Sequence, residues 1–246
     1  MIFRQLFDSD SSTYSYLVGC AESRTAVLVD PVLERVDRDL ALLQQLELHL
    51  AFTLETHIHA DHVTGAARLR SLTACRIAYP ARDMPAEADL AVSELDPLVV
   101  GTQTLQPLFT PGHTDGHHSY LVDSGSVARV MTGDALLIDG CGRTDFQGGC
   151  AQTLFQSVHE KIFTLAPDTL VYPGHDYNQR FVSTVGQERE RNPRLGGSRT
   201  AEEFVSIMAE LNLPPPKKID VAVPANRQCG ALPSAKLPPP PPAKGK

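Results

Sequence analysis

Residues 56–62 read T-H-I-H-A-D-H and place three histidines and one aspartate in one short stretch. Residues two apart on an extended segment face the same side, so His57 and His59 can aim at one point. Asp61 and His62 follow in the chain and can aim at a neighbouring point. Neutral imidazole and carboxylate together suit Zn, Fe or Mn. The stretch therefore predicts a metal site.

Three further donors lie far away in the chain, and each directly follows a glycine. They are His113 in T-P-G-H, Asp134 in M-T-G-D and His175 in Y-P-G-H. Glycine allows the tight turn that brings a side chain at the end of a strand into a cleft. We therefore expect these donors to join the histidine stretch at one site.

Strands and helices must alternate along the chain to bring these donors together. Short β-branched runs predict strands, or strand-rich stretches, at 14–19, 25–32, 50–58, 97–113, 118–124, 127–138 and 169–177. Apolar residues near a 3.6 period predict helices at 35–48, 63–72, 151–165 and 201–211. Because both halves mix the two element types, we expect two β/α halves packed sheet to sheet, with helices outside.

The composition is that of an ordinary globular protein. The chain has 246 residues and a formal net charge of −7, and its length allows a single large core. No Lys/Arg block is longer than a pair, which argues against a nucleic-acid partner. No apolar run approaches the ~20 residues that a membrane-spanning helix needs, so we expect no membrane partner.

The cysteines and the amino terminus indicate a reducing compartment. Five cysteines are scattered without a C-x-x-C motif, and M-I-F-R-Q-L-F-D lacks the features of a secretory signal. We expect free thiols and a cytoplasmic protein. Cys141 and Cys229 could be reactive, but a buried and inert cysteine is the commoner case.

The carboxyl-terminal segment differs from the rest of the chain. Residues 231–246 are rich in proline and flanked by lysine, so they cannot bury a core. We expect a disordered or extended tail there, and a catalytic domain over residues 1–230.

The metal-site motifs carry a resemblance. H-x-H-x-D-H with a later G-H-T, G-D and G-H resembles the metallo-β-lactamase superfamily, which implies a four-layer αβ/βα sandwich. More narrowly, residues 56–66, 132–150 and 172–177 are similar to the persulfide dioxygenases. The likeness runs from about residue 1 to about residue 230.

The resemblance implies roles for the donors. It implies one Fe(II) per chain, held by His57, His113 and Asp134. Other donors match positions that hold a second metal in hydrolytic relatives, and here they are expected to surround the ligands without binding metal. They are His59, Asp61, His62 and His175. We expect Asp176 to orient a neighbouring residue through a hydrogen bond.

The resemblance also implies that Arg143, Tyr177 and Arg194 hold the glutathione part of the substrate. Arginine suits the two carboxylates of glutathione because its guanidinium donates two parallel hydrogen bonds. The alternative for Arg143 is a structural salt bridge with Asp145. The D-G-H-H at 115–118 departs from the family pattern and could alter the surroundings of the metal.

These assignments predict an iron-dependent dioxygenase that oxidises glutathione persulfide with O2 to sulfite and glutathione. Two histidines and one carboxylate leave adjacent coordination positions open, where both reactants can be held side by side. A homodimer and a functional link to a sulfurtransferase are further expectations from the resemblance.

Three other functions are compatible with the same donors. A glyoxalase II-like thioester hydrolase would use two metals, and ligand counting does not exclude it. The residues Ile and Ala within the histidine motif, and the lack of a lysine-rich carboxyl-terminal segment, favour the dioxygenase. A nuclease would need a basic face. A non-catalytic iron-binding protein would bind iron without turnover.

Overall fold

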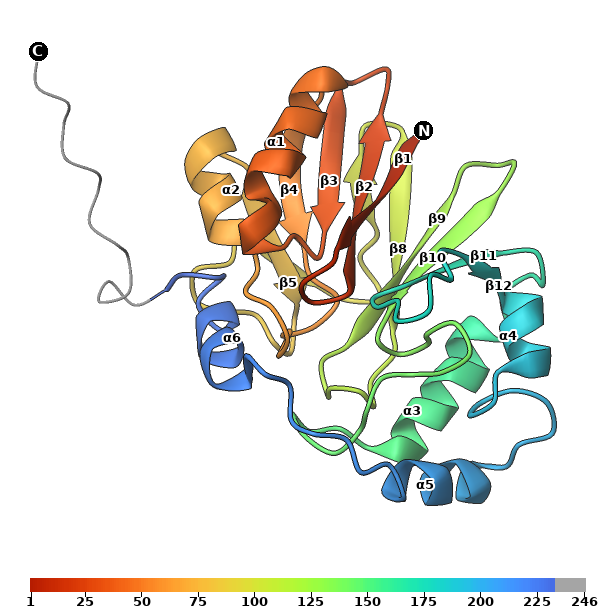
Figure 1. The fold of residues 1–246 in the computed structure, drawn as a ribbon. Helices are drawn as coiled ribbons and strands as arrows, with labels where there is room; N and C mark the ends of the chain where they lie inside the picture. The colour runs from red at the N-terminus through yellow and green to blue at the C-terminus, as the bar shows by residue number, and fades with distance from the viewer. Residues whose placement is uncertain (233–246) are drawn as a thin grey trace, which may run out of the picture.

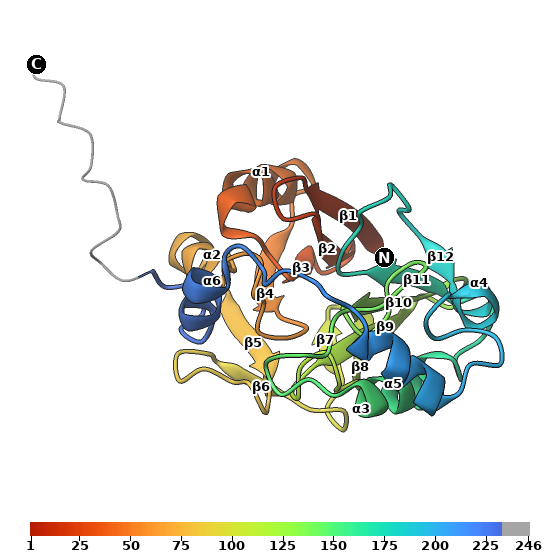
Figure 2. The ribbon, with the colours of Figure 1, turned by 60° about the horizontal axis from the view of Figure 1, so that its bottom comes forward.

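The computed structural model describes residues 1–232, which form two six-stranded sheets packed between helices (Figures 1 and 2). The first sheet has the order β1 (Ile2–Asp8), β2 (Thr13–Cys20), β3 (Thr25–Val29), β4 (His49–Leu54), β5 (Arg76–Pro80) and β6 (Leu90–Val92). The second has the order β12 (Ser183–Thr184), β11 (Leu170–Pro173), β10 (Ala128–Gly133), β9 (His118–Asp123), β8 (Gln103–Phe109) and β7 (Leu98–Val100).

Helices cover the outer face of each sheet (Figure 2). Strands β3 to β6 are parallel and need crossover connections, which α1 (Val36–Gln45) and α2 (Ala66–Thr73) provide for β3 to β5. On the second sheet lie α3 (Ala151–Ser157), continued by a π-helical turn, and α5 (Ala201–Ala209). The remaining helices are α4 (Val185–Arg191), beside β12, and α6 (Ile219–Asn226), beside α2.

Alternation along the strands divides the buried side chains between layers. Tyr16 and Val18 of β2 point into the apolar layer between the sheets, where they meet Tyr120 and Val122 of β9. Leu17 points to the opposite side, into the layer shared with α1 and α2. A third apolar cluster joins the second sheet to α3 and α5. The predicted four-layer αβ/βα sandwich is confirmed.

The predicted helices and strands are confirmed in type, although most are shorter than predicted. Two of the observed element boundaries determine where the donors of the histidine motif lie. The strand predicted at 50–58 ends at Leu54, and the helix predicted at 63–72 begins at Ala66. The histidine motif therefore occupies a loop between β4 and α2.

Four strands and two helices were not predicted from the sequence: β1, β5, β6, β12, α4 and α6. Strand β6 has 3 residues, which is too short for an alternating pattern to stand out. Helix α6 contains Pro224, a residue that normally argues against a helix interior. Within residues 1–232 no helix is long and apolar enough to cross a membrane. From residue 233 the predicted tail lies outside the described residues.

Asn226 of α6 fastens the histidine loop to the carboxyl-terminal region. Its Oδ1 accepts a hydrogen bond from the backbone N–H of Thr64 (2.8 Å). Its Nδ2 donates to the carbonyl oxygens of His59 (2.8 Å) and His62 (2.9 Å). The residue is buried, so water cannot replace these bonds.

We expect Asn226→Ala to lower the free energy of unfolding by about 3 kcal/mol, because buried backbone groups without a partner cost about 1–3 kcal/mol each. Urea denaturation measures the change. The control is Asn212→Ala in an exposed loop, expected to stay within about 0.5 kcal/mol of the parent. Equal stability of the two variants would contradict the fastening role of Asn226.

Candidate metal centre

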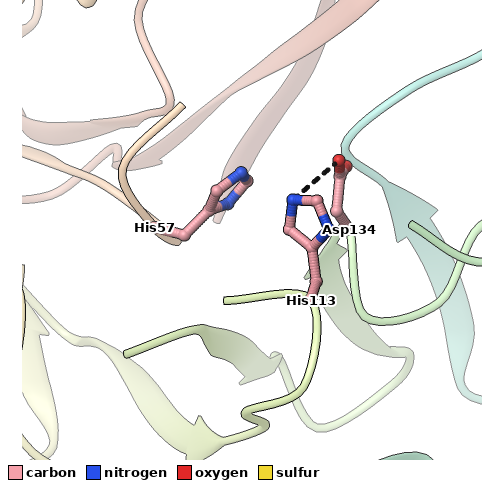
Figure 3. Close-up of side chains that lie close together, drawn as sticks. All are labelled: His57, His113 and Asp134. Atoms are coloured by element: carbon pink, nitrogen blue, oxygen red, sulfur yellow. Dashed lines mark ion pairs between the residues drawn. The ribbon is translucent and has the colours of Figure 1, made fainter. Parts of the chain in front are cut away.

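The predicted donors converge at the carboxyl ends of strands from both sheets (Figure 3). His57 follows β4, His113 lies between β8 and β9, and Asp134 directly follows β10. Their donor atoms all lie within 4.8 Å of one another. The three side chains line a cavity of about 610 Å³. Segments far apart in the sequence therefore share one point that opens toward a cavity.

Hydrogen bonds determine which nitrogen of His57 is free. The Thr56 hydroxyl donates to Oδ2 of Asp30 (3.0 Å), so its oxygen accepts from Nδ1–H of His57 (2.9 Å). Nε2 of His57 then carries the lone pair. Burial lowers the pKa of His57 well below its usual value, and neighbouring imidazoles lower it further. The ring is neutral and can bind a cation.

His113 is oriented in the same way by a different acceptor. Its Nδ1 lies 2.6 Å from the carbonyl oxygen of Arg143, which can only accept, so Nδ1 carries the hydrogen. Its Nε2 lies 3.5 Å from Oδ2 of Asp134, the contact dashed in Figure 3. In both His57 and His113 the Nδ1 is engaged by an acceptor, which leaves Nε2 as the nitrogen that could bind a cation.

The Asp134 carboxylate completes the group. Gly133 has φ +49°, a conformation that glycine adopts without a steric penalty, and turns the chain at the end of β10. A Cβ on Gly174 would lie 2.5 Å from Oδ1 of Asp134, so glycine is needed for this close approach. This Oδ1 is buried and has no hydrogen-bond partner within residues 1–232. A cation would satisfy it, so the donors fit a metal ion.

A second group of donors lies beside the first. The donor atoms of His59, Asp61 and His62 lie within 4.8 Å of one another. Nε2 of His59 lies 3.0 Å from Oδ1 of Asp30 and 3.5 Å from Oε2 of Glu55. Burial lowers the pKa of His59, but the two carboxylates raise it well above its usual value. The ring is therefore an imidazolium between two acids.

Asp61 and His175 connect the two groups. Oδ2 of Asp61 accepts hydrogen bonds from the Thr13 hydroxyl (2.9 Å) and from Nδ1–H of His62 (3.0 Å). Nε2 of His175 lies 3.7 Å from this oxygen and 3.6 Å from Oδ2 of Asp134. The His175 Nδ1–H donates to a backbone carbonyl (3.2 Å), and although burial lowers the pKa of this ring, the carboxylates of Asp134 and Asp61 raise it above its usual value.

Asp176, predicted to orient a neighbouring residue, holds a tyrosine. Its Oδ2 accepts from the Tyr14 hydroxyl (2.8 Å), and its Oδ1 accepts from the backbone N–H of Asn178 (2.8 Å). These bonds connect β2 to the loop after β11, which also carries His175.

The three side chains predicted to bind glutathione all line the cavity: Arg143, Tyr177 and Arg194. The Arg143 guanidinium makes a two-pronged ion pair with Asp145, both contacts at 2.6 Å, and donates to the Pro214 carbonyl (2.6 Å). The structural salt bridge that the sequence allowed is thus present. Arg194 forms no ion pair within the described residues.

The cavity wall includes a buried thiol. Arg194 donates to the carbonyl oxygen of Cys141 (3.0 Å). Burial raises the pKa of the Cys141 thiol to about 11, and burial raises that of Cys229 to about 12. Both thiols stay protonated at neutral pH, which makes them poor nucleophiles.

Several residues that support the site were not predicted from the sequence: Asp30, Glu55, Thr56 and Asn226. Asp30 carried a usable signal, because it directly follows the apolar strand β3, much as Asp134 follows β10. Thr56 and Glu55 flank the histidine motif, but nothing in their types indicated a role.

Comparison with known proteins agrees with this geometry. The model of the metallo-beta-lactamase superfamily matches residues 9–175. The mitochondrial persulfide dioxygenase ETHE1 of Homo sapiens is 51% identical over 230 residues, covering 94% of this chain and 89% of that protein. A hydroxyacylglutathione hydrolase of Cereibacter sphaeroides is 36% identical over 181 residues, covering 71% of this chain and 68% of that protein.

A solved structure extends the match to three dimensions. The crystal structure of ETHE1 from Myxococcus xanthus is 51% identical and superposes with a TM-score of 0.90, covering 94% of this chain and 100% of that chain. With this identity over nearly the whole length, the chain belongs to the persulfide dioxygenase family of the metallo-beta-lactamase superfamily.

Proposed function

We propose that this chain is an Fe(II)-dependent dioxygenase that oxidises glutathione persulfide with O2 to sulfite and releases glutathione. The observation that carries the proposal is the convergence of two imidazoles and one carboxylate beside the cavity. The atoms balance with one water: persulfide anion, O2 and H2O give glutathione, sulfite and one proton. The relatives named persulfide dioxygenase support the substrate class.

The proposed iron ligands are Nε2 of His57, Nε2 of His113 and the Asp134 carboxylate. Two histidines and one carboxylate on one face are typical of non-haem Fe(II) oxygenases. Bound ferrous iron would supply the electrons that activate O2. Two neutral donors and one anion leave the occupied site with net positive charge. That charge favours a persulfide anion in the cavity.

The charge state of His59 supports a single metal. Nε2 of His59 contacts Asp30 and Glu55, and these two carboxylates raise the pKa of the ring, which disfavours metal binding by His59. Asp61 already accepts hydrogen bonds from Thr13 and His62 on one oxygen. We therefore assign His59, Asp61, His62 and His175 to the surroundings of the iron.

One observation favours a second candidate function. Nε2 of His62 is buried and has no hydrogen-bond partner within residues 1–232. A second metal there, bridged by Asp134, would suit a thioester hydrolase such as the Cereibacter sphaeroides relative. Metal content separates this candidate from the dioxygenase.

Binding of glutathione is assigned to the cavity wall. Arg194 is the stronger carboxylate anchor, because Arg143 would have to exchange Asp145 for the substrate. Tyr177 is exposed and stacks on the His175 ring, with centroids 5.6 Å apart, so its hydroxyl can meet a ligand that enters the cavity. A homodimer, a link to a sulfurtransferase and a cytoplasmic location stay predictions.

We expect protein loaded with Fe(II) to contain about one iron per chain and to consume O2 while forming sulfite from glutathione persulfide. His57→Ala, His113→Ala and Asp134→Ala should each lose iron and O2 uptake, whereas His49→Ala, exposed at the start of β4, should keep both. Elemental analysis and an oxygen electrode make the measurement. Two zinc ions per chain with thioester cleavage would establish the hydrolase instead, and iron without O2 uptake would indicate a binding protein.

We expect Arg194→Gln to raise KM for glutathione persulfide about tenfold or more while kcat changes less, because a hydrogen bond to a charged group contributes about 1.5–3 kcal/mol. Arg143→Ala should also raise KM more than it lowers kcat. Steady-state oxygen uptake gives both constants. The matched control is Arg191→Gln on the exposed surface of α4. If the KM of either variant equals that of Arg191→Gln, the arginine replaced in that variant does not bind the substrate.

A further inference from the structure

His117 lies beside the proposed iron ligands but is not one of them. It belongs to the D-G-H-H stretch at 115–118, which departs from the family pattern, and its side chain is fully buried. Its ring stacks on that of His57, with centroids 5.1 Å apart and an interplanar angle of 29°.

A chain of hydrogen bonds fixes the tautomer of His117 from both ends. At one end the backbone N–H of Asp134, which can only donate, points at Nε2 (3.1 Å). At the other end the Ser119 hydroxyl donates to the Thr132 carbonyl (3.2 Å), so Thr110 must donate to Ser119 (2.9 Å). Thr110 then accepts from Nδ1–H of His117 (2.9 Å). Both ends require the same neutral tautomer.

The two ends of this chain of hydrogen bonds lie on either side of Gly133. They are the carbonyl oxygen of Thr132 and the N–H of Asp134, the residues between which the backbone turns at φ +49°. The packing here is close, because a Cβ on Gly133 would lie 2.6 Å from Nε2 of His117. The imidazole therefore spans the turn that presents the Asp134 carboxylate, while its face supports His57.

We propose that His117 is a positioning residue that holds Asp134 and His57 in the geometry that binds the metal. The proposal rests on the proposed ligand set. An acceptor at the place of Nε2 is the essential feature, because without it the Asp134 N–H is buried and unpaired and the turn relaxes. Residues that orient metal ligands typically change metal affinity by about 10- to 100-fold when they are replaced.

Two substitutions test the hydrogen bonds of the two His117 nitrogens separately. In His117→Gln the side-chain oxygen can reach the place of Nε2 and accept from Asp134. In His117→Asn the amide can reach only the place of Nδ1 and donate to Thr110, which leaves the Asp134 N–H without a partner. The probe is Co(II) added to metal-free protein, followed by its visible absorption in competition with a chelator. The melting temperature of the metal-free protein is measured alongside.

We expect His117→Asn to weaken Co(II) binding about 10- to 100-fold, and His117→Gln to bind nearly as tightly as the parent. The two metal-free variants should melt at similar temperatures, because each keeps one of the two hydrogen bonds. The matched control is His118→Gln, since His118 is also buried but donates to the Gly116 carbonyl, away from the ligands. It should bind Co(II) like the parent.

Equal Co(II) affinity of His117→Asn and His117→Gln would overturn the positioning role. It would also be overturned if the loss of Co(II) affinity in each variant matched the loss in its melting temperature. If both variants fail to fold, Thr110→Val provides the same test, because it removes the acceptor that fixes the tautomer; unchanged Co(II) affinity then rejects the proposal. Asp134→Ala tests the ligand set separately. If Asp134→Ala binds Co(II) as tightly as the parent, the ligand assignment itself is rejected. If Asp134→Ala loses Co(II) binding while His117→Asn binds like the parent, only the role of His117 is rejected.

Discussion

The centre depends on one constraint: a buried imidazole must satisfy its Nδ1–H inside the protein. Nδ1–H of His57 donates to Thr56, and that of His113 donates to the carbonyl oxygen of Arg143. Rotating either ring would leave a buried donor unpaired, at a cost of about 1–3 kcal/mol. The acceptors therefore hold both Nε2 lone pairs toward Asp134. Metal affinity originates as much in these acceptors as in the histidines.

A single buried carboxylate assigns opposite charge states to two neighbouring histidines. Oδ1 of Asp30 accepts from the Thr56 N–H (2.7 Å) and contacts Nε2 of His59 (3.0 Å), while Oδ2 accepts from the Thr56 hydroxyl (3.0 Å). Through Thr56 it fixes the neutral tautomer of His57. Directly, and together with Glu55, it stabilises the charged form of His59. The same carboxylate thereby favours opposite protonation in the two histidines of the H-x-H pair.

The sequence allowed the donors to be predicted but not their supports. His57, His113 and Asp134 lie within predicted strand-rich stretches, and the local signals are their residue types and, for His113 and Asp134, the preceding glycine. The role of Asn226 was not predictable, because its partner Thr64 lies 162 residues away and the helix that carries it contains a proline. For Arg143 the sequence offered both a salt bridge and a ligand role, and only the side-chain conformation shows the ion pair.

Arg143 connects the cavity wall to the metal centre within one residue. Its carbonyl oxygen orients His113, while its guanidinium pairs with Asp145 and donates to the Pro214 carbonyl (2.6 Å). The guanidinium also lies over the Phe146 ring, 4.6 Å from its centroid. A side chain fixed at so many points restrains its own backbone, so the cavity wall and the carbonyl oxygen that accepts from His113 are coupled through one residue. This double contact distinguishes Arg143 from Arg194, whose side-chain hydrogen bond stays within the wall.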